Sequence, residues 1–326
     1  MCAFRERLQF LRIAYARSIT LKERTRVHIV ELLLLSVAVI WGTNFSLIKL
    51  LYEYFHPLAF NALRMTLATL TMIAILKARG VPLAIDRRDL PSLAGLGILS
   101  NTGYQLLFVL GLERTRAGNA GLLLSLVPIF AYIAGLALGR ERFNRTVLAG
   151  ILMSVLGVAA ITVIGPADLS FAGTLVGDLM IIAAAFCWGW YTGSSSTMLA
   201  RYGPLRVTVV AMLFGVGLML PITLPWLIVH PWSAVVPWAW AGLAASAWLA
   251  IVYSYFVWAH AIRTIGVART VVVGNLTPIV ALLAGWLLLG ERPVIAQGAA
   301  IVLILAGIFL VRSQNTTPII MREESG

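Results

Sequence analysis

Residues 121–142 read GLLLSLVPIFAYIAGLALGRER, and 150 positions further on residues 271–292 read VVVGNLTPIVALLAGWLLLGER, so the chain repeats itself. The shared positions, in this stretch and just beyond it, are Pro128, Ala131, Ala134, Gly135, Leu138, Glu141, Arg142, Ala149 and Gly157, which recur as Pro278, Ala281, Ala284, Gly285, Leu288, Glu291, Arg292, Ala299 and Gly307. Earlier in each copy, Trp41-Gly42 recurs as Trp188-Gly189. The sequence therefore predicts two copies of one structural unit.

Composition places this unit in a membrane. The 326 residues are 60% hydrophobic and only 12% charged, and their mean hydropathy is +0.92. Soluble domains carry about 25% charged residues, and an apolar helix of about 20 residues crosses the hydrocarbon layer. We therefore expect an all-α integral membrane protein with ten transmembrane helices. The predicted spans are 29–51, 57–77, 90–111, 117–138, 146–164, 174–200, 205–230, 236–262, 267–289 and 294–312.

Each copy contains an odd number of these spans. Five fall in a first repeat at 29–164 and five in a second at 174–312, joined by a turn-rich linker at 165–173. Units with an odd number of spans, joined head to tail, cross the bilayer in opposite senses. Inverted repeats are typical of secondary transporters, whose binding site lies where the halves meet. We therefore predict two inverted five-helix repeats around a central cavity.

The net charge of +12 is a topology signal. If the N-terminus faces the cytoplasm, seven basic residues of the N-terminal arm (1–28) and thirteen in other segments lie inside, against three outside. This asymmetry satisfies the positive-inside rule, so the arm and the C-terminal tail (313–326) are expected in the cytoplasm and no nucleic-acid partner is expected. Arginine greatly outnumbers lysine, which favours a bacterial source and hence the inner (plasma) membrane. Cys2 and Cys187 are too far apart to pair.

Two prolines lie inside predicted spans four and nine. Pro128 and Pro278 each remove a backbone hydrogen bond and kink a helix. In a bilayer the freed carbonyl needs a partner or must line a cavity. A polar residue, Ser125 or Asn275, stands three positions before each proline. The kinks are therefore either bends that help packing or a pair of cavity-lining bends at the symmetry axis.

Polar and aromatic side chains within the spans follow helical stripes. On spans three and eight they occupy matching positions, and the same is true of spans one and six. Sparse polarity between aromatic walls is typical of small-molecule sites, whereas the alternative is that the polar groups only join helices. The residues predicted to bind a small-molecule substrate are Trp41, Asn44, Asn101, Tyr104, Gln105, Phe108, Ser125, Trp188, Tyr191, Ser195, Tyr255, Trp258 and Asn275.

Charges within or at the ends of spans leave several readings open. Lys49 lies where it can snorkel to the interface, while Arg64 could bind carbonyls, pair with an acid or meet a substrate carboxylate. Glu31 and Asp178 begin spans one and six, where the helix dipole favours acids; the alternative is coupling to an ion. Glu141-Arg142 and its copy could cap helix ends or lock loops.

Several functional classes lack their residues. No Asp or Glu lies near the centre of a span, so no membrane-embedded proton-exchanging carboxylate is expected. The sequence contains no Walker motif, no metal-ligand cluster and no nucleophile placed beside a histidine base. We predict no enzyme activity, no cofactor and no metal.

The stretch Trp41-Gly-Thr-Asn-Phe-Ser-Leu-Ile-Lys49, followed by Pro57 and Arg64, resembles the EamA-type transporters of the drug/metabolite transporter superfamily. Gly111-Leu-Glu-Arg-Thr115 and Gly290-Glu-Arg292 carry the same resemblance. It implies ten helices in two inverted repeats, with helices one, three, four, six, eight and nine around a cavity and helices five and ten peripheral. It also implies alternating access, and the YddG-type amino-acid exporters are the subgroup the chain looks most like.

The expected function is export of amino acids or related small metabolites across the inner membrane by alternating access. Uniport or exchange is favoured because a central acid is missing. One alternative is a transporter of sugar phosphates, nucleotide sugars or drugs, although phosphorylated substrates need several cavity cations. Another is a membrane channel or a non-transporting scaffold. The sequence gives no prediction of the oligomeric state.

Overall fold

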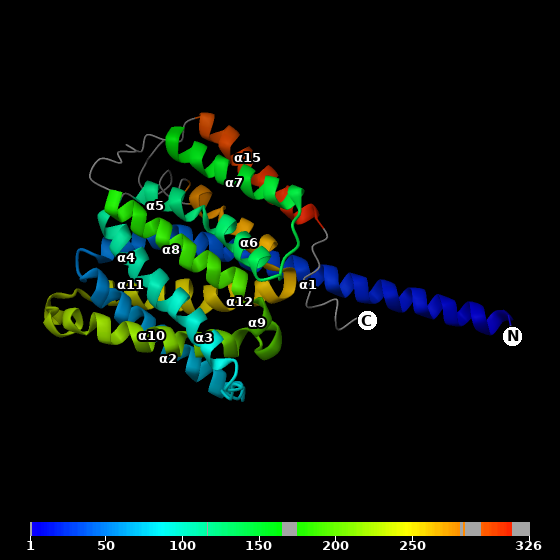
Figure 1. Cartoon of the computed structure of the whole chain (residues 1–326), viewed down its shortest axis with the longest axis horizontal. Helices are drawn as coiled ribbons and strands as arrows, with labels where there is room; N and C mark the ends of the chain where they lie inside the picture. Colours follow the sequence, from blue (N-terminus) through cyan, green and yellow to red (C-terminus); the bar gives the residue numbers. More distant parts are fainter. Residues whose placement is uncertain (1, 116, 165–174, 281–282, 284–294, 315–326) are drawn as a thin grey trace.

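The structure is a computed structural model that describes residues 2–115, 117–164, 175–280, 283 and 295–314. Every regular element in these ranges is a helix, as the sequence predicts (Figure 1). In chain order the elements are α1 (Cys2–Leu51), α2 (Pro57–Ala78), α3 (Leu90–Gly97), η1 (Ile98–Gly103), α4 (Tyr104–Arg114), α5 (Ala117–Leu124), α6 (Val127–Ala137), α7 (Arg145–Ile164), α8 (Leu175–Ser194), α9 (Ser196–Tyr202), α10 (Pro204–Val229), η2 (Trp232–Ala234), α11 (Pro237–Ala245), η3 (Ser246–Tyr253), α12 (Ser254–Ile265), α13 (Val267–Gly274) and α15 (Ile295–Ser313).

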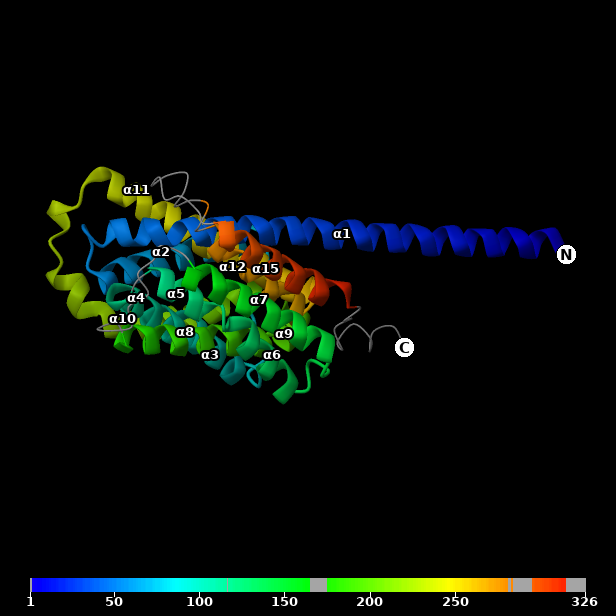
Figure 2. The ribbon, with the colours of Figure 1, turned by 90° about the horizontal axis from the view of Figure 1, so that it is seen from above.

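Six described helical runs are long and apolar enough to cross a membrane. They are Val27–Leu51, Pro57–Ala78, Leu90–Arg114, Leu175–Ser194, Pro204–Val229 and Pro237–Ile265. Shorter apolar helices lie at Val127–Ala137, Arg145–Ala160, Val267–Val280 and Gly298–Ser313, and they overlap predicted spans four, five, nine and ten. The N-terminal part of α1 extends well beyond the bundle (Figure 2). The chain is therefore a multi-pass helical membrane protein.

Two of the long runs change their winding partway. Residues Ile98–Gly103 (η1) and Ser246–Tyr253 (η3) form π-helices, each preceded and followed by α-helix. The two segments occupy corresponding places in the repeated sequence. A π-helix widens the turn and often marks a functional site. Ala250 and Ile251 of η3 line the cavity described below, and η1 ends at the residue before Tyr104, which also lines it.

Both prolines interrupt their helices. Turns at residues 125–126 and 275–276 separate α5 from α6 and end α13. The amides of Leu126 and Asn275 bond three residues back, to Leu123 and Val272, with N···O distances of 3.2 Å. The prolines supply no amide, so the carbonyls of Leu124 and Gly274 lose their usual partner four residues on. The predicted kinks are thus full breaks in the helix.

Helices α7 and α15 pack side by side at the edge of the bundle (Figure 1). Glycines let their backbones touch, since a Cβ added to Gly307 would lie 2.5 Å from the carbonyl oxygen of Gly150. A Cβ on Gly157 would lie 2.9 Å from the carbonyl oxygen of Ala300. A Cβ on Gly298 would meet no described atom within 4 Å, so that glycine does not contribute. Close packing through small residues is how helices associate in lipid.

Candidate functional site

A cavity of about 100 Å³ lies between helices of both repeats, at the level of the two helix breaks. The structure brings ten of the thirteen predicted binding residues to its wall, together with both kink prolines. These ten are Trp41, Asn44, Tyr104, Gln105, Phe108, Ser125, Trp188, Tyr255, Trp258 and Asn275. Their role in binding stays a prediction, but their position around one cavity is a property of the fold.

Residues at equivalent positions of the two repeats touch each other in this cavity. Trp41 and Trp188 meet edge to face, with ring centroids 5.9 Å apart. Gln105 Nε2 donates a hydrogen bond of 2.7 Å to the hydroxyl of Tyr255, which stands 150 positions later. Equivalent residues can contact one another only near the axis that relates the copies. The cavity therefore lies where the two repeats of the sequence contact each other.

Trp188 is the centre of the aromatic wall. Its ring lies 5.0 Å from Tyr255, 5.1 Å from Tyr104 and 5.2 Å from Tyr191, between centroids. It also contacts Trp41 and Trp258. The other two indoles use their N–H groups elsewhere: one donates to the carbonyl of Ala250 and the other to the hydroxyl of Thr192. Trp41 and Trp258 therefore offer ring surface to a ligand, and the fixed N–H groups hold the rings in place.

Arg64 is not among the predicted binding residues, yet it lines the cavity. It is 2% exposed. Its Nη2 donates 2.7 Å bonds to Asn61 Oδ1 and Gln105 Oε1, and its Nη1 lies 3.3 Å from Ser246 Oγ. Gln105 therefore accepts from Arg64 and donates to Tyr255, which joins α2, α4 and α12 through one polar chain.

The helix breaks face the cavity. Leu124 and Ser125 line it at the first break, and Gly274 and Asn275 line it at the second. Asn275 Nδ2 also donates a 2.8 Å bond to Ser154 on α7, which fixes the second break to the peripheral helix pair. Of the two readings of the prolines, the geometry favours cavity-lining bends.

Three predicted residues lie off the cavity wall as described. Asn101, within η1, donates to Ser100 Oγ at 2.9 Å and lies against α10. Tyr191 packs behind Trp188. Ser195 bonds to the carbonyl of Thr192 at 3.1 Å. Lining residues absent from the predicted set include Phe45, Arg64, Leu124 and Thr277. Phe45 adjoins a predicted residue and Thr277 precedes a kink proline, so position along the chain could have found both.

The acids predicted to begin spans one and six have structural partners. Asp178 lies in the first turn of α8, but Glu31 lies in the interior of α1, so the helix-dipole explanation is wrong for Glu31. Glu31 forms an ion pair with Arg312 of α15, and His28 Nδ1 lies 3.6 Å from the same carboxylate. Asp178 accepts a hydrogen bond from the Thr115 hydroxyl. Lys49 Nζ donates a hydrogen bond of 3.2 Å to the carbonyl oxygen of Thr115. None of these residues lines the cavity, so the geometry favours the structural reading over ion coupling.

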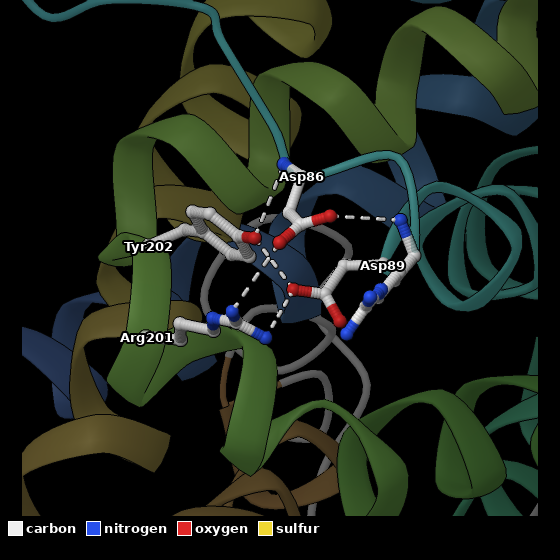
Figure 3. Close-up of polar contacts among 5 residues, drawn as sticks. Asp86, Asp89, Arg201 and Tyr202 are labelled. Atoms are coloured by element: carbon white, nitrogen blue, oxygen red, sulfur yellow. Dashed lines mark hydrogen bonds and ion pairs between the residues drawn. The ribbon is translucent and has the colours of Figure 1, made fainter.

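A polar cluster joins the segment between α2 and α3 to the end of α9 (Figure 3). Arg201 Nη1 lies 2.6 Å from Asp89 Oδ2, and the Tyr202 hydroxyl donates to the same oxygen at 2.5 Å. That hydroxyl also accepts from the amide of Asp86 at 3.3 Å. The hydrogen bond to Asp89 raises the pKa of Tyr202 above its ordinary value. These hydrogen bonds and the ion pair thus link the two repeats at one end of the bundle.

Glu141 caps a helix of the other repeat. Its carboxylate accepts hydrogen bonds from the backbone amides of Ala268 and Val267, the first turn of α13. This contact favours the capping role considered for Glu141; its copy Glu291 lies outside the described residues. Burial raises the pKa of the Glu141 carboxyl above its ordinary value, and the two amide bonds oppose that change in part.

The raised pKa predicts a pH-dependent stability for Glu141→Gln. The folded state holds the proton more tightly than the unfolded state, so the stability contributed by Glu141 falls as pH rises between the ordinary and the raised pKa. Glutamine does not titrate. The melting temperature of E141Q minus that of the wild type should therefore increase as the pH rises from the ordinary pKa to the raised pKa. Melting curves of purified protein at several pH values measure it, with the exposed Glu113→Gln as control. A difference that is constant with pH would contradict the assignment.

A multi-pass helical bundle with a cavity on the contact between two related halves has the architecture of a membrane transporter. The EamA-like transporter family matches residues 28–163 and again residues 175–313. The chain therefore belongs to the EamA-like transporter family, and it is a transporter, not an enzyme.

Named relatives agree with this assignment. The chain is 26% identical to the uncharacterized transporter YyaM of Bacillus subtilis, over 86% of its length and 92% of that protein. It is 29% identical to a probable terminal-alkyne amino-acid exporter of Streptantibioticus cattleyicolor, over 86% of the chain and 93% of that protein. It is 27% identical to a probable amino-acid metabolite efflux pump of Salmonella typhimurium, over 85% of the chain and 93% of that protein. A crystal structure with 21% identity covers 91% of the chain at a TM-score of 0.73 and shares its fold.

Proposed function

We propose that the protein exports amino acids or related small metabolites across the bacterial inner membrane by alternating access. The observation that carries the proposal is the cavity where the two repeats contact each other, which is lined by both helix breaks and by aromatic residues of both repeats. Two relatives with 27% and 29% identity bear the names of amino-acid or metabolite exporters. In this proposal the repeats at 29–164 and 174–312 form ten spans of inverted topology, with both termini in the cytoplasm.

The cavity has groups suited to such substrates. The carbonyls of Leu124 and Gly274, released by the prolines, are acceptors for an ammonium group, because backbone C=O groups in a bilayer need partners. The indoles and tyrosines around Trp188 pack against an apolar side chain. No lining residue among those the structure describes is Asp or Glu, which favours uniport or exchange over proton antiport.

Counterflow in reconstituted liposomes tests the proposal. Vesicles loaded with one unlabelled amino acid should take up the labelled form against empty vesicles, with saturation, and a screen of the common amino acids identifies the substrate. Flux that rises linearly without saturation would indicate a channel, and no flux with any amino acid or sugar phosphate would favour a scaffold. Flux driven by a pH gradient and lost in Glu31→Gln or Asp178→Asn would overturn the preference for uniport.

Sugar phosphates are the second candidate substrate, and the cavity disfavours them. A phosphate monoester carries a charge of about −1.5 to −2, whereas Arg64 is the single cationic residue on the cavity wall as described. Uptake of a sugar phosphate in preference to every amino acid would reverse this order.

A further inference from the structure

We propose that Arg64 is the anion-recognition residue of the cavity and that the transported molecule presents a carboxylate to it; this inference rests on the proposed transport function. It assigns a chemical group of the substrate to one residue of the site. Neither the family match nor the names of the relatives assign such a role.

The first argument is the charge balance around the guanidinium. Its hydrogen-bond acceptors, Asn61, Gln105 and Ser246, are all neutral. No carboxylate among the described residues forms an ion pair with it. Arginine keeps its charge in proteins. A buried charge without a partner of opposite sign is strongly destabilising, so an anion is the natural complement of this site.

The second argument is access. Arg64 lines the cavity, so a ligand there can reach it. Its Nε atom is buried and has no hydrogen-bond partner among the described residues, which leaves a donor for a ligand oxygen. None of the described lining residues is acidic. Between aromatic walls the local dielectric is low, and a single positive charge attracts an anion more strongly than it does in water.

The third argument is the rigidity of the guanidinium. The ring of Phe60 lies beneath it, 5.2 Å from ring centroid to Cζ. Gln105 holds Nη2 from one side and is itself anchored on Tyr255. The bonds to Asn61 and Gln105 take both hydrogens of Nη2, so the donors left for a carboxylate are the Nε–H and the second hydrogen of Nη1, held in a fixed orientation. Because one cation balances one negative charge, the arrangement favours a monoanionic carboxylate over a phosphate.

Matched ligand pairs test the inference with the purified full chain. Quenching of tryptophan fluorescence reports binding near Trp41, Trp188 and Trp258. The probes are the common amino acids, their carboxamides, which keep the ammonium but lose the negative charge, and monocarboxylates without an ammonium. Carboxylates should bind at least about tenfold more tightly than the matched amides, because a hydrogen bond to a charged group is lost in the amide.

Variants of Arg64 complete the test. Arg64→Gln should remove the preference for the carboxylate, while Arg64→Lys should weaken binding and keep the preference, since lysine retains the charge but lacks the fixed N–H donors of the guanidinium. Lys49→Gln is the control, because it removes a span cation that does not line the cavity. If R64Q does not fold, comparing acid and amide binding by the wild type and by R64K still tests whether the charge at position 64 recognises the carboxylate.

Each result bears on one claim. Equal binding of acids and amides by the wild type, no millimolar binding of any carboxylate, or an undiminished preference in R64Q would overturn the role of Arg64. Selective carboxylate binding without counterflow would leave that role intact and refute the proposed transport. Saturable counterflow of amides and acids alike would support the proposed transport and refute the role of Arg64.

Discussion

Replacing Trp188 with alanine is expected to destabilise the protein by about 3–5 kcal/mol, the usual effect of removing a buried tryptophan ring, and to abolish saturable transport. The ring is 4% exposed and contacts five other aromatic side chains. Those contacts come from α1, α4, α8 and α12, so its removal opens a void at the place where the repeats meet. Lipid cannot replace the van der Waals contacts that the Trp188 ring makes there, because protein encloses the site.

Trp248→Ala is the matched control. That tryptophan is 48% exposed, and its indole N–H donates to Thr71. Thermal unfolding in detergent and counterflow should place W248A near the wild type and W188A well below it. Trp188→Phe keeps part of the wall and should lie between them. If W188A melts with W248A and still transports, the aromatic cluster is not a structural centre.

The predicted fold agrees with the structure where the signal is local. Apolar stretches, the repeat and the two prolines are visible in sequence, and the described helices follow them. The breaks before Pro128 and Pro278 exceed a kink because the residues two and three positions before each proline form a turn. Whether a proline bends or breaks a helix depends on what packs around the freed carbonyls, and that comes from distant parts of the chain.

The predicted site is correct where α-helical spacing holds. The stripe Tyr104, Gln105 and Phe108 lies in α4 and lines the cavity. The α-helical spacing predicts Asn101, three residues before Tyr104, on the same face, but it belongs to the π-helix η1, whose wider turn changes the direction of its side chain. Winding of this kind is set by tertiary packing and has no clear signal in one sequence. Arg64 was undecided for a related reason, since Gln105 and Ser246 reach it from other helices.

Gly97→Ala is expected to destabilise the protein by about 1–3 kcal/mol or more, as overpacking does. A Cβ at Gly97 would lie 2.2 Å from the carbonyl oxygen of Ala211 on α10. On the other side of the crossing, a Cβ on Gly215 would lie 2.3 Å from the carbonyl oxygen of Gly97. These neighbours are backbone atoms, so they cannot rotate away and the helices must separate. Separation also strains the 2.6 Å bond from the Thr102 hydroxyl to the Gly215 carbonyl.

Gly95→Ala is a control from the same short helix, α3. A Cβ there would meet nothing within 4 Å, so the only effect left is helix propensity, which favours alanine by about 1 kcal/mol. The two substitutions are chemically identical and two residues apart, yet their effects on the melting temperature should have opposite signs. The double variant G97A/G215A should cost less than the sum of its parts, because one separation of α3 from α10 relieves both clashes. Additive losses, or a loss in G95A equal to that in G97A, would mean that this crossing is not the close contact that positions η1 beside the cavity.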